Sequence, residues 1–425
     1  MLIEFSATNY RSIREKQALS LVAAPSPDLK EQNTFDSGVR AVPRLLRSVV
    51  MFGPNAGGKS NIVQAMDFMR DFVLTSASGT QEGERIPVTP YRLDELSRQA
   101  PSEFEVLFVE DGIRYQYGFS VSQERIEHEW LLAYPTGKAQ RWFERAFNPD
   151  TKEDEWYFGP SLKGRTQVIK DATRVNALFL STAVQLNNEQ LRPVFHWFND
   201  RLAVIRSHGR FPSSFRNFTV EQCKEEASRK RIMEFLQEAD LGIDDLKLET
   251  HILKEDDLPD GLPSGLKEQA QKMIGKELVR PLFLHETNHA GEMEEFVLED
   301  ESDGTQNIFA LAGPWLDVLQ QGMVLVIDEL DTSLHPKMVR FLVGLLHNSK
   351  TNQNNAQLVG TSHDVTLMEG DLFRRDQIWF VEKDPSRATR LVPLSDFSPR
   401  KGEAIMKGYL RGRYGALPYI PRLAS

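Results

Sequence analysis

The chain has 425 residues, of which 40 % are hydrophobic and 26 % charged, a composition typical of a globular protein with two or three domains. A single cysteine, Cys223, excludes a disulfide framework and suits a reducing cytoplasm. No run approaches the ~18 apolar residues of a membrane span, and residues 1–5 do not begin a signal peptide. The net charge of −10 argues against a surface coated for nucleic acid, and it is compatible with a local basic groove. We therefore expect a cytoplasmic protein that is not embedded in a membrane.

Two short strands are predicted at the start of the chain, over residues 2–8 and 15–22. The segment Asn9-Tyr10-Arg11-Ser12-Ile13 joins them. Considered alone, this pattern is an ordinary edge hairpin whose Arg11 faces solvent. Residues 25–43 contain Pro25, Pro27 and Pro43, and they are predicted to form a loop.

A glycine-rich turn follows an apolar run. Residues 45–52 lead into Gly53-Pro54-Asn55-Ala56-Gly57-Gly58-Lys59-Ser60, and a helical pattern extends from there to residue 75. The apolar positions of that helix share one face: Ile62, Ala65, Met66, Met69, Phe72 and Val73. Strand, glycine-rich turn and helix in this order are the context of a P-loop. A glycine turn without a ligand is the alternative, but such chance matches rarely have both flanking elements.

The P-loop interpretation assigns a role to each polar residue of the turn. Backbone N–H groups around Asn55, Gly57 and Gly58 close on phosphate oxygens at the start of the helix. Lys59 is placed for the β- and γ-phosphates, and the Ser60 hydroxyl for Mg²⁺. We therefore predict that the protein binds a nucleoside triphosphate, ATP, with Mg²⁺.

An antiparallel sheet is predicted next. Strand patterns occupy residues 103–109 and 113–121, and the turn over 110–112 makes them a hairpin. Further strands are expected over 125–133 and around 141–147. Together they indicate a β-subdomain beside the nucleotide core.

Residues 165–290 have a different character. Helical spacing appears over 176–187, 189–198 and 220–239, while 244–276 is polar and broken by prolines. The mixed charges favour a solvated face over a binding surface. Without a repeat period or a long heptad array, this region is predicted to be a compact helical arm.

A second polar cluster follows the apolar strand predicted over residues 322–329. The strand ends in Asp328 and Glu329, where Asp328 can hold the magnesium shell and Glu329 can polarise the attacking water. Another strand, over 357–362, ends at His363. A lone histidine is more often structural, but this one is placed where contact with a γ-phosphate is available.

The segment Glu301-Ser302-Asp303-Gly304-Thr305-Gln306 precedes an apolar helix predicted over 308–319. By itself, a Ser-x-Gly step is most simply a helix cap, but it also offers a hydroxyl and free N–H groups to an anion. After Glu329, the turn Leu330-Asp331-Thr332-Ser333-Leu334-His335-Pro336 leads into a helix over 338–347.

In this order the motifs resemble those of ABC-type ATPase heads, and residues 9–13 look like the opening of the RecF/SMC/OLD branch. The chain is more closely similar to the AbiLi/RloA-like AAA ATPases of prokaryotic abortive-infection and restriction-linked operons. Their ending is similar to residues 375–380 and 407–416. The resemblance implies an α/β fold, with an ABC-type P-loop NTPase core, an antiparallel β-subdomain and an inserted helical arm.

The resemblance also implies roles for single residues. Ser302 and Gly304 would contact the γ-phosphate bound by a partner subunit. Asp331 would lie at the dimer interface, His363 would be the switch histidine, and Arg11 would sit near the nucleotide. The family's glutamine loop is not assignable, because each glutamine in the relevant region fits poorly: Gln81, Gln99 and Gln116.

The predicted domains are residues 1–165 and 286–425, which together form the ATPase head, and 166–285, an arm for oligomerisation or partner contact. Two heads would sandwich two nucleotides, so a homodimer or higher homo-oligomer is expected. OLD-type relatives carry a Toprim nuclease after the ATPase, and residues 364–425 are too few for one.

The leading hypothesis is therefore an ATPase of an antiphage system of the abortive-infection type. It would respond to a phage-derived trigger and control a separate effector encoded nearby, such as a Toprim-like nuclease. The alternative is a RecF/SMC-like repair ATPase acting on DNA, and a transporter ATPase is a weaker third. Whether DNA binds directly stays open.

Overall fold

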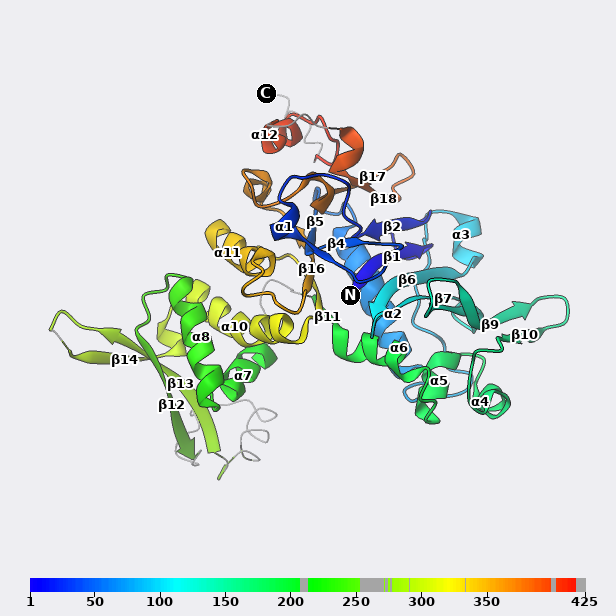
Figure 1. Ribbon diagram of the computed structural model, residues 1–425, viewed down its shortest axis with the longest axis horizontal. Coiled ribbons are helices and arrows are strands. Elements are labelled where there is room, and N and C mark those ends of the chain that lie inside the picture. The colour runs from blue at the N-terminus through cyan, green and yellow to red at the C-terminus, as the bar shows by residue number, and fades with distance from the viewer. Residues whose placement is uncertain are drawn as a thin grey trace. The chain divides into compact units, whose positions relative to one another are not determined.

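The computed structural model describes residues 1–206, 213–252, 271, 274–275, 277–289, 291–332, 334–398 and 403–417. The chain forms two compact units (Figure 1). The head unit comprises Met1–Arg206, Val318–Asp331 and Val339–Ser425. The insert unit comprises Ser207–Asp317 and Thr332–Met338. The sequence predicts that residues 166–206 are part of the arm, whereas the structure groups them with the head unit.

A six-stranded sheet lies at the centre of the head unit, in the order β11-β15-β16-β5-β17-β18. Its strands are β5 (Ser48–Phe52), β11 (Leu202–Arg206), β15 (Val324–Asp328), β16 (Gln357–Ser362), β17 (Ile378–Lys383) and β18 (Thr389–Pro393). All pairs are parallel except β17 with β18. Every residue of β5, β15 and β16 is buried, which explains why these strands read as continuous apolar runs. Their carboxyl ends meet at one edge of the sheet.

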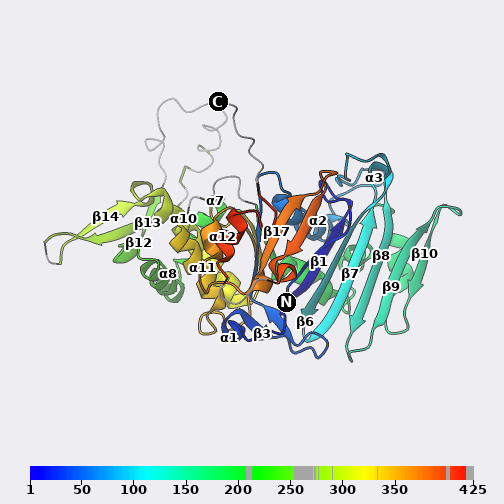
Figure 2. The same ribbon diagram turned by 90° about the horizontal axis from the view of Figure 1, so that it is seen from above.

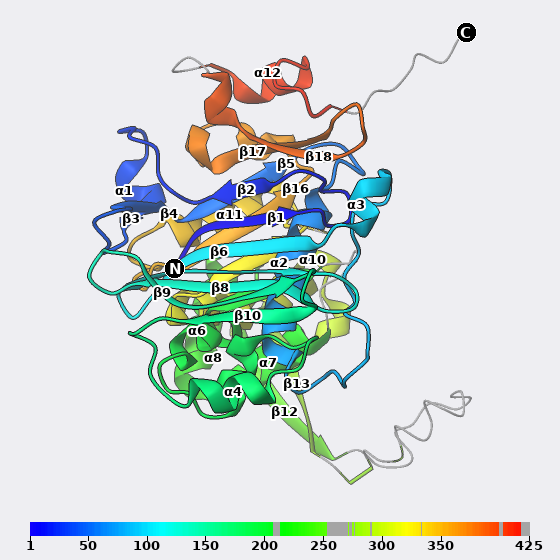
Figure 3. The same ribbon diagram turned by 90° about the vertical axis from the view of Figure 1, so that its right-hand side faces the viewer.

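The second sheet of the head unit is antiparallel and seven-stranded, in the order β10-β9-β8-β7-β6-β1-β2 (Figure 2). Its strands are β1 (Leu2–Thr8), β2 (Gln17–Ser20), β6 (Ser102–Glu110), β7 (Ile113–Val121), β8 (Ile126–Tyr134), β9 (Gln140–Asn148) and β10 (Glu153–Phe158). The predicted strands are confirmed, but β1 lies inside the sheet, between β2 and β6 (Figure 3). β10 was not predicted, because it alternates only between exposed and half-buried residues.

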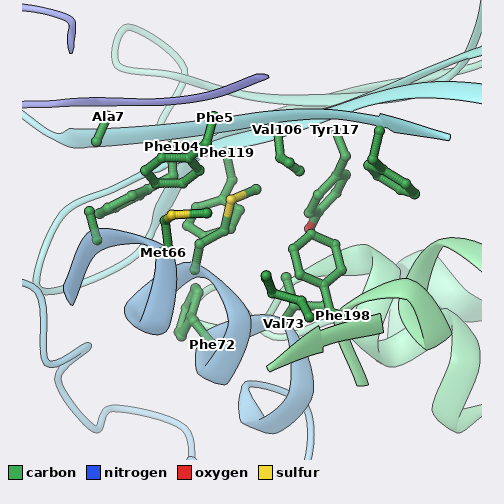
Figure 4. Close-up of a cluster of buried hydrophobic side chains, with 14 of the residues drawn as sticks. Phe5, Ala7, Met66, Phe72, Val73, Phe104, Val106, Tyr117, Phe119 and Phe198 are labelled. Carbon is green, nitrogen blue, oxygen red and sulfur yellow. The ribbon is translucent and has the colours of Figure 1, made fainter. Parts of the chain in front are cut away.

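Helix α2 (Lys59–Thr75) packs against strands of both sheets. All six apolar positions predicted for its inner face are buried. In Figure 4, Met66 and Phe72 point from α2 toward Phe104 and Phe119 of the antiparallel sheet. The Phe72 and Phe119 rings are 5.6 Å apart between centroids. One hydrophobic core therefore holds the P-loop helix between the sheets.

One predicted strand is in fact two. The apolar run over residues 45–52 divides at Arg47 into β4 (Arg44–Leu46) and β5. β4 pairs with β3 (Thr34–Asp36) in a separate two-stranded sheet, so the segment 25–43 is not only a loop. Arg47 is only 5 % exposed. Its buried guanidinium donates to the Asn352 carbonyl and lies over the Phe35 ring.

A glutamine joins the ends of the two larger sheets. The Leu2 N–H donates to Gln357 Oε1 at 2.6 Å, and Gln357 Nε2 donates to the carbonyls of Leu2 and Leu46. The other described helices of the head unit are α1 (Lys30–Asn33), α3 (Glu95–Gln99), α4 (Thr166–Ala172), α5 (Phe179–Gln185), α6 (Arg192–His196), η1 (Trp197–Arg201), η4 (Val365–Met368), η5 (Arg375–Gln377), η6 (Leu394–Phe397) and α12 (Ile405–Leu410). Helix α11 (Pro336–His347) begins in the insert unit and continues in the head unit.

The insert unit mixes helices with a three-stranded sheet, in the order β12-β13-β14. Its described elements are α7 (Ser213–Gln222), α8 (Glu226–Glu238), β12 (Asp245–Ile252), β13 (Glu277–Glu286), β14 (Met293–Val297), η3 (Leu298–Asp300) and α10 (Asp303–Gln321), whose last turn lies in the head unit. The helix predicted over 220–239 is α8, which begins only at Glu226, and residues 220–222 are the end of α7. The expected arm is not all helical, and part of its polar stretch, 253–270, lies outside the described residues. Among the helices that the structure describes, none has the length and apolar character to cross a membrane.

Candidate active site

The glycine-rich turn lies at the carboxyl end of β5, as the sequence predicts. Helix α2 begins at Lys59, and Gly58 precedes it with φ of 113°, a conformation that favours glycine. The turn is also pressed against β17 and β18. A Cβ at Gly53 would lie 2.1 Å from the Val381 carbonyl oxygen, and one at Gly58 would lie 2.0 Å from Thr389 Oγ1. The backbone N–H groups of this helix start provide an anion site.

Lys59 reaches back over the turn. Its Nζ donates to the carbonyls of Gly53 at 2.8 Å and Pro54 at 3.2 Å, and the side chain is buried. Burial lowers the pKa of Lys59, while the charges of Asp328, Asp331 and Glu329 act in the opposite direction. The structure therefore brings the P-loop lysine and the carboxylates after β15 into one site, although they are far apart in the sequence.

Both acidic residues at the tip of β15 are bonded to β16, Asp328 through its carboxylate and Glu329 through its backbone N–H. Thr361 Oγ1 donates to Asp328 Oδ1 at 2.7 Å and accepts the Glu329 N–H at 2.7 Å. Glu329 has a φ of 56°, in the left-handed region. Non-glycine residues in this region cluster at functional sites, where the surrounding structure holds them. Thr361 was not singled out by the sequence.

His363 stands just past the end of β16 and is exposed. Its backbone N–H donates to Asp331, at 3.3 Å from Oδ1 and 3.1 Å from Oδ2. Asp331 therefore has a contact within its own chain that the sequence did not suggest. Its place at a dimer interface and the contact of His363 with a γ-phosphate stay predictions.

The donor set suits Mg²⁺. Ser60 offers a hydroxyl from the first turn of α2, and Asp328 offers a carboxylate from the tip of β15. Among the residues that the structure describes, no group of three His, Cys, Asp or Glu side chains could hold a metal. Mg²⁺ with a nucleotide takes one or two protein oxygens, and phosphates and water complete its shell. Ser60 and Asp328 would hold it here.

Arg11 and Asn55 are both exposed, and the structure gives neither residue a role in fixing the turn. Arg11 has a φ of 51°, and its Nε donates to the Tyr10 hydroxyl at 3.3 Å. Its place near the nucleotide stays a prediction. Gln116, one of the poor fits for the glutamine loop, is engaged by Glu105 and Tyr134 on the antiparallel sheet.

A neighbour of Arg11 supports the P-loop, and the sequence did not reveal it. Asn61 Nδ2 donates to Ser12 Oγ at 2.5 Å, and Ser12 Oγ lies 2.7 Å from Thr389 Oγ1. The Thr389 hydroxyl in turn donates to the Gly57 carbonyl at 3.3 Å and accepts from Lys383 Nζ at 3.0 Å. This chain of side chains joins the β1–β2 turn, helix α2 and β18 behind the glycines. Its one sequence signal is that Ser12 lies in the segment 9–13.

Ser302 and Gly304 lie in the insert unit, at the start of α10. Ser302 Oγ accepts the Thr305 N–H at 3.1 Å and lies 2.9 Å from Thr305 Oγ1, which is a helix cap. Within one chain, Ser302 therefore caps α10, as the simplest interpretation of the sequence predicts. Ser302 is exposed, and its contact with a nucleotide held by a partner subunit stays a prediction.

Comparison with known proteins agrees with this geometry. Residues 48–369 match the family model described as "AAA domain, putative AbiEii toxin, Type IV TA system". No curated protein matches the sequence. The solved structures that the chain resembles include an SMC head domain from Thermotoga maritima (13 % identity, 92 % of this chain and 98 % of that chain covered, TM-score 0.41) and an SmcHead bound to the C-winged helix domain of ScpA (10 %, 93 % and 98 %, 0.38). The recombination mediator protein RecF is a third (12 %, 92 % and 98 %, 0.29). With TM-scores of 0.41 or less, these three similarities do not assign a role to this chain.

The family match covers well over half of the chain and includes the P-loop, Asp328, Glu329 and His363. The predicted α/β fold class with a P-loop core is confirmed, and the chain is a P-loop ATPase. It belongs to the AAA-domain family described as putative AbiEii toxin of a Type IV TA system.

Proposed function

We propose that the protein is the ATP-binding and ATP-hydrolysing subunit of an antiphage system of the abortive-infection type. In this proposal, ATP-dependent association of two heads controls a separate toxic effector encoded nearby, and a phage-derived trigger starts the response. The family description, which names a toxin of a TA system, supports a partnership with a second gene product. The resemblance of the motifs to AbiLi/RloA-like ATPases supports the defence role.

The observation that carries the proposal is the position of Lys59, Asp328 and Glu329 in one site of the head unit. The Ser302 turn belongs to the insert unit and exposes the start of α10. A helix start that faces solvent is free to meet the phosphate bound by a second copy. ATP would then join two subunits, and hydrolysis would release them.

Each residue has a distinct part in this cycle. Lys59 and the N–H groups of the P-loop bind the β- and γ-phosphates. Ser60 and Asp328 would hold Mg²⁺, which would supply positive charge beside the phosphates. Glu329 orients the water that attacks the γ-phosphate and accepts its proton, and His363 contacts the γ-phosphate from the tip of β16.

Phage challenge tests the proposal. The gene is expressed alone, with its neighbouring genes, and with those neighbours as the Lys59→Ala variant. We expect protection only when a neighbour is present, and we expect Lys59→Ala to change it. Robust protection by this gene alone would overturn the two-component proposal.

A second assay addresses the chemistry of the isolated protein. We expect it to hydrolyse ATP slowly and to cleave neither DNA nor RNA. An ATPase rate that rises when DNA is added would favour the alternative, a RecF/SMC-like repair ATPase that acts on DNA itself.

A further inference from the structure

The tips of β15 and β16 are joined beyond the last pair of their strand ladder. Ile327 pairs with Gly360 in that ladder. Thr361 is the next residue of β16 after Gly360, and its carbonyl accepts the Leu330 N–H at 2.9 Å. The Thr361 side chain, which is fully buried, makes the remaining connections between these tips. Three consecutive positions, Asp328, Glu329 and Leu330, are thereby tied to one residue of β16.

The Thr361 hydroxyl is used in both directions. It has one proton, which it gives to Asp328 Oδ1, and it accepts the backbone N–H of Glu329. Most hydroxyls in protein interiors bond to backbone groups of their surroundings. This one bonds to the carboxylate of Asp328, the candidate magnesium ligand, and to the backbone N–H of Glu329, the candidate base.

Each bond restrains a different degree of freedom. Donation to Oδ1 fixes the rotation of the Asp328 carboxylate. Acceptance of the N–H holds Glu329 in its left-handed conformation, which costs a residue with a Cβ about 1–2 kcal/mol. Such a conformation persists only when its surroundings determine it. Without the hydroxyl, Glu329 loses one of the contacts that hold its backbone in this conformation.

We propose that Thr361 is a positioning residue for ATP hydrolysis. Its hydroxyl sets the placement of Asp328 relative to Glu329, so it acts on the metal site and on the water-activating carboxylate. The phosphate-binding P-loop and Lys59 follow a different strand, β5, and make no bond to Thr361 that the structure describes. Loss of the hydroxyl therefore lowers kcat and weakens the response to Mg²⁺ but leaves the affinity for nucleotide without Mg²⁺ unchanged.

Three variants test this role. Thr361→Val keeps the β-branched shape and volume but removes the hydroxyl. Thr361→Ser keeps the hydroxyl and removes one methyl group. Thr351→Val makes the same chemical change in the turn between α11 and β16, where the hydroxyl donates to the Leu345 carbonyl.

Two measurements are made on each purified variant. The first is ATP turnover at saturating Mg²⁺, with kcat separated from KM. The second, independent of turnover, is the Mg²⁺ concentration that half-maximally changes the binding of a fluorescent ATP analogue, compared with binding in EDTA. For Thr361→Val we expect kcat to fall and the Mg²⁺ midpoint to rise, each about 10–100-fold, as for partners that orient a metal ligand. Binding in EDTA stays as in the wild type.

Thr361→Ser and Thr351→Val should behave as the wild type in both measurements. Wild-type turnover and Mg²⁺ response in Thr361→Val would overturn the proposal. A Thr361→Ser variant that loses turnover would overturn it too, because packing of the methyl group would then be the important property. The serine variant stays informative even if the valine variant does not fold.

Discussion

Thr389 Oγ1 occupies the space that a side chain at Gly58 would need, because a Cβ built there would lie 2.0 Å away. The same hydroxyl donates to the carbonyl of Gly57. The P-loop is therefore shaped by contact with β18 as well as by the flexibility of its glycines.

Gly58→Ala should damage the loop in two ways. The new Cβ clashes with Thr389, and alanine does not readily adopt a φ of 113°. We expect the free energy of unfolding to fall by about 2–4 kcal/mol, with loss of ATP binding. Urea unfolding and titration of a fluorescent ATP analogue measure both effects. Gly344→Ala in α11 is the control, since no atom from outside the neighbouring backbone of the helix lies within 4 Å of its Cβ and alanine favours a helix. Equal behaviour of the two variants would contradict the close contact.

Lys59→Ala should abolish nucleotide binding, because it removes the cation facing the β- and γ-phosphates. The loss should be visible in equilibrium binding of a labelled ATP analogue. Lys350→Ala removes an exposed lysine in the turn after α11 and should bind as the wild type does. Unchanged binding in Lys59→Ala would refute the P-loop assignment.

Glu329→Gln should bind ATP but hydrolyse it about 10²–10⁴-fold more slowly, since the amide cannot accept the proton of the attacking water. Single-turnover hydrolysis and nucleotide binding, measured on the same preparation, separate the two properties. If turnover stays at the wild-type rate, another residue is the base, and His363→Ala is the next variant to measure.

Ser302→Arg should leave ATP binding by one subunit intact and block association. The added bulk and charge obstruct the exposed start of α10, where a phosphate held by a partner would approach. Size-exclusion chromatography with ATP, using the Glu329→Gln background to prevent hydrolysis, reports association. Wild-type association of the Ser302→Arg variant would exclude a composite site built on this turn.

His347 should make stability depend on pH. Burial, with a smaller contribution from the Arg47 charge, lowers the pKa of His347 to about 3, and its Nε2 lies 2.7 Å from Ser48 Oγ. Because the folded pKa lies below the unfolded value of about 6.5, the stabilisation is complete above pH 6.5 and is lost toward pH 3. Between pH 6.5 and 5 the loss is about 2 kcal/mol.

The measurement for His347 is the urea midpoint as a function of pH. In His347→Gln the decline below pH 6.5 should be shallower than in the wild type, while the two curves run parallel above pH 7. Parallel curves over the whole range would show that His347 is not the titrating group.

The sequence predicted those parts of the site that have a local pattern. The six apolar positions of α2 recur at helical spacing, and Asp328 and Glu329 end an unbroken apolar strand. The helix and the acidic end of the strand could therefore be predicted. The division of residues 45–52 into two strands could not be predicted, because the carbonyl that bonds to the buried Arg47 belongs to Asn352. The sequence around Arg47 does not indicate a partner so far along the chain.

The same reason explains why the supporting side chains were missed. Thr361, Ser12 and Thr389 are small hydroxyl residues that look ordinary in their own segments. Their partners are Asp328, the P-loop and one another, which only the folded chain brings within hydrogen-bond distance. Acidic residues at strand ends can thus be predicted from the sequence, whereas the side chains that hold them in position cannot.

The bond between Leu2 and Gln357 also has a consequence during synthesis. A ribosome adding about 5–20 residues per second needs roughly 20–70 s to travel from one to the other. For that period β1 can pair with β2 and β6, but the partner that ties it to β16 does not yet exist. The antiparallel sheet is therefore translated first and must wait, with apolar surface uncovered, for the strands that complete the ATPase core. Nascent chains are most exposed to chaperones and proteases in that interval.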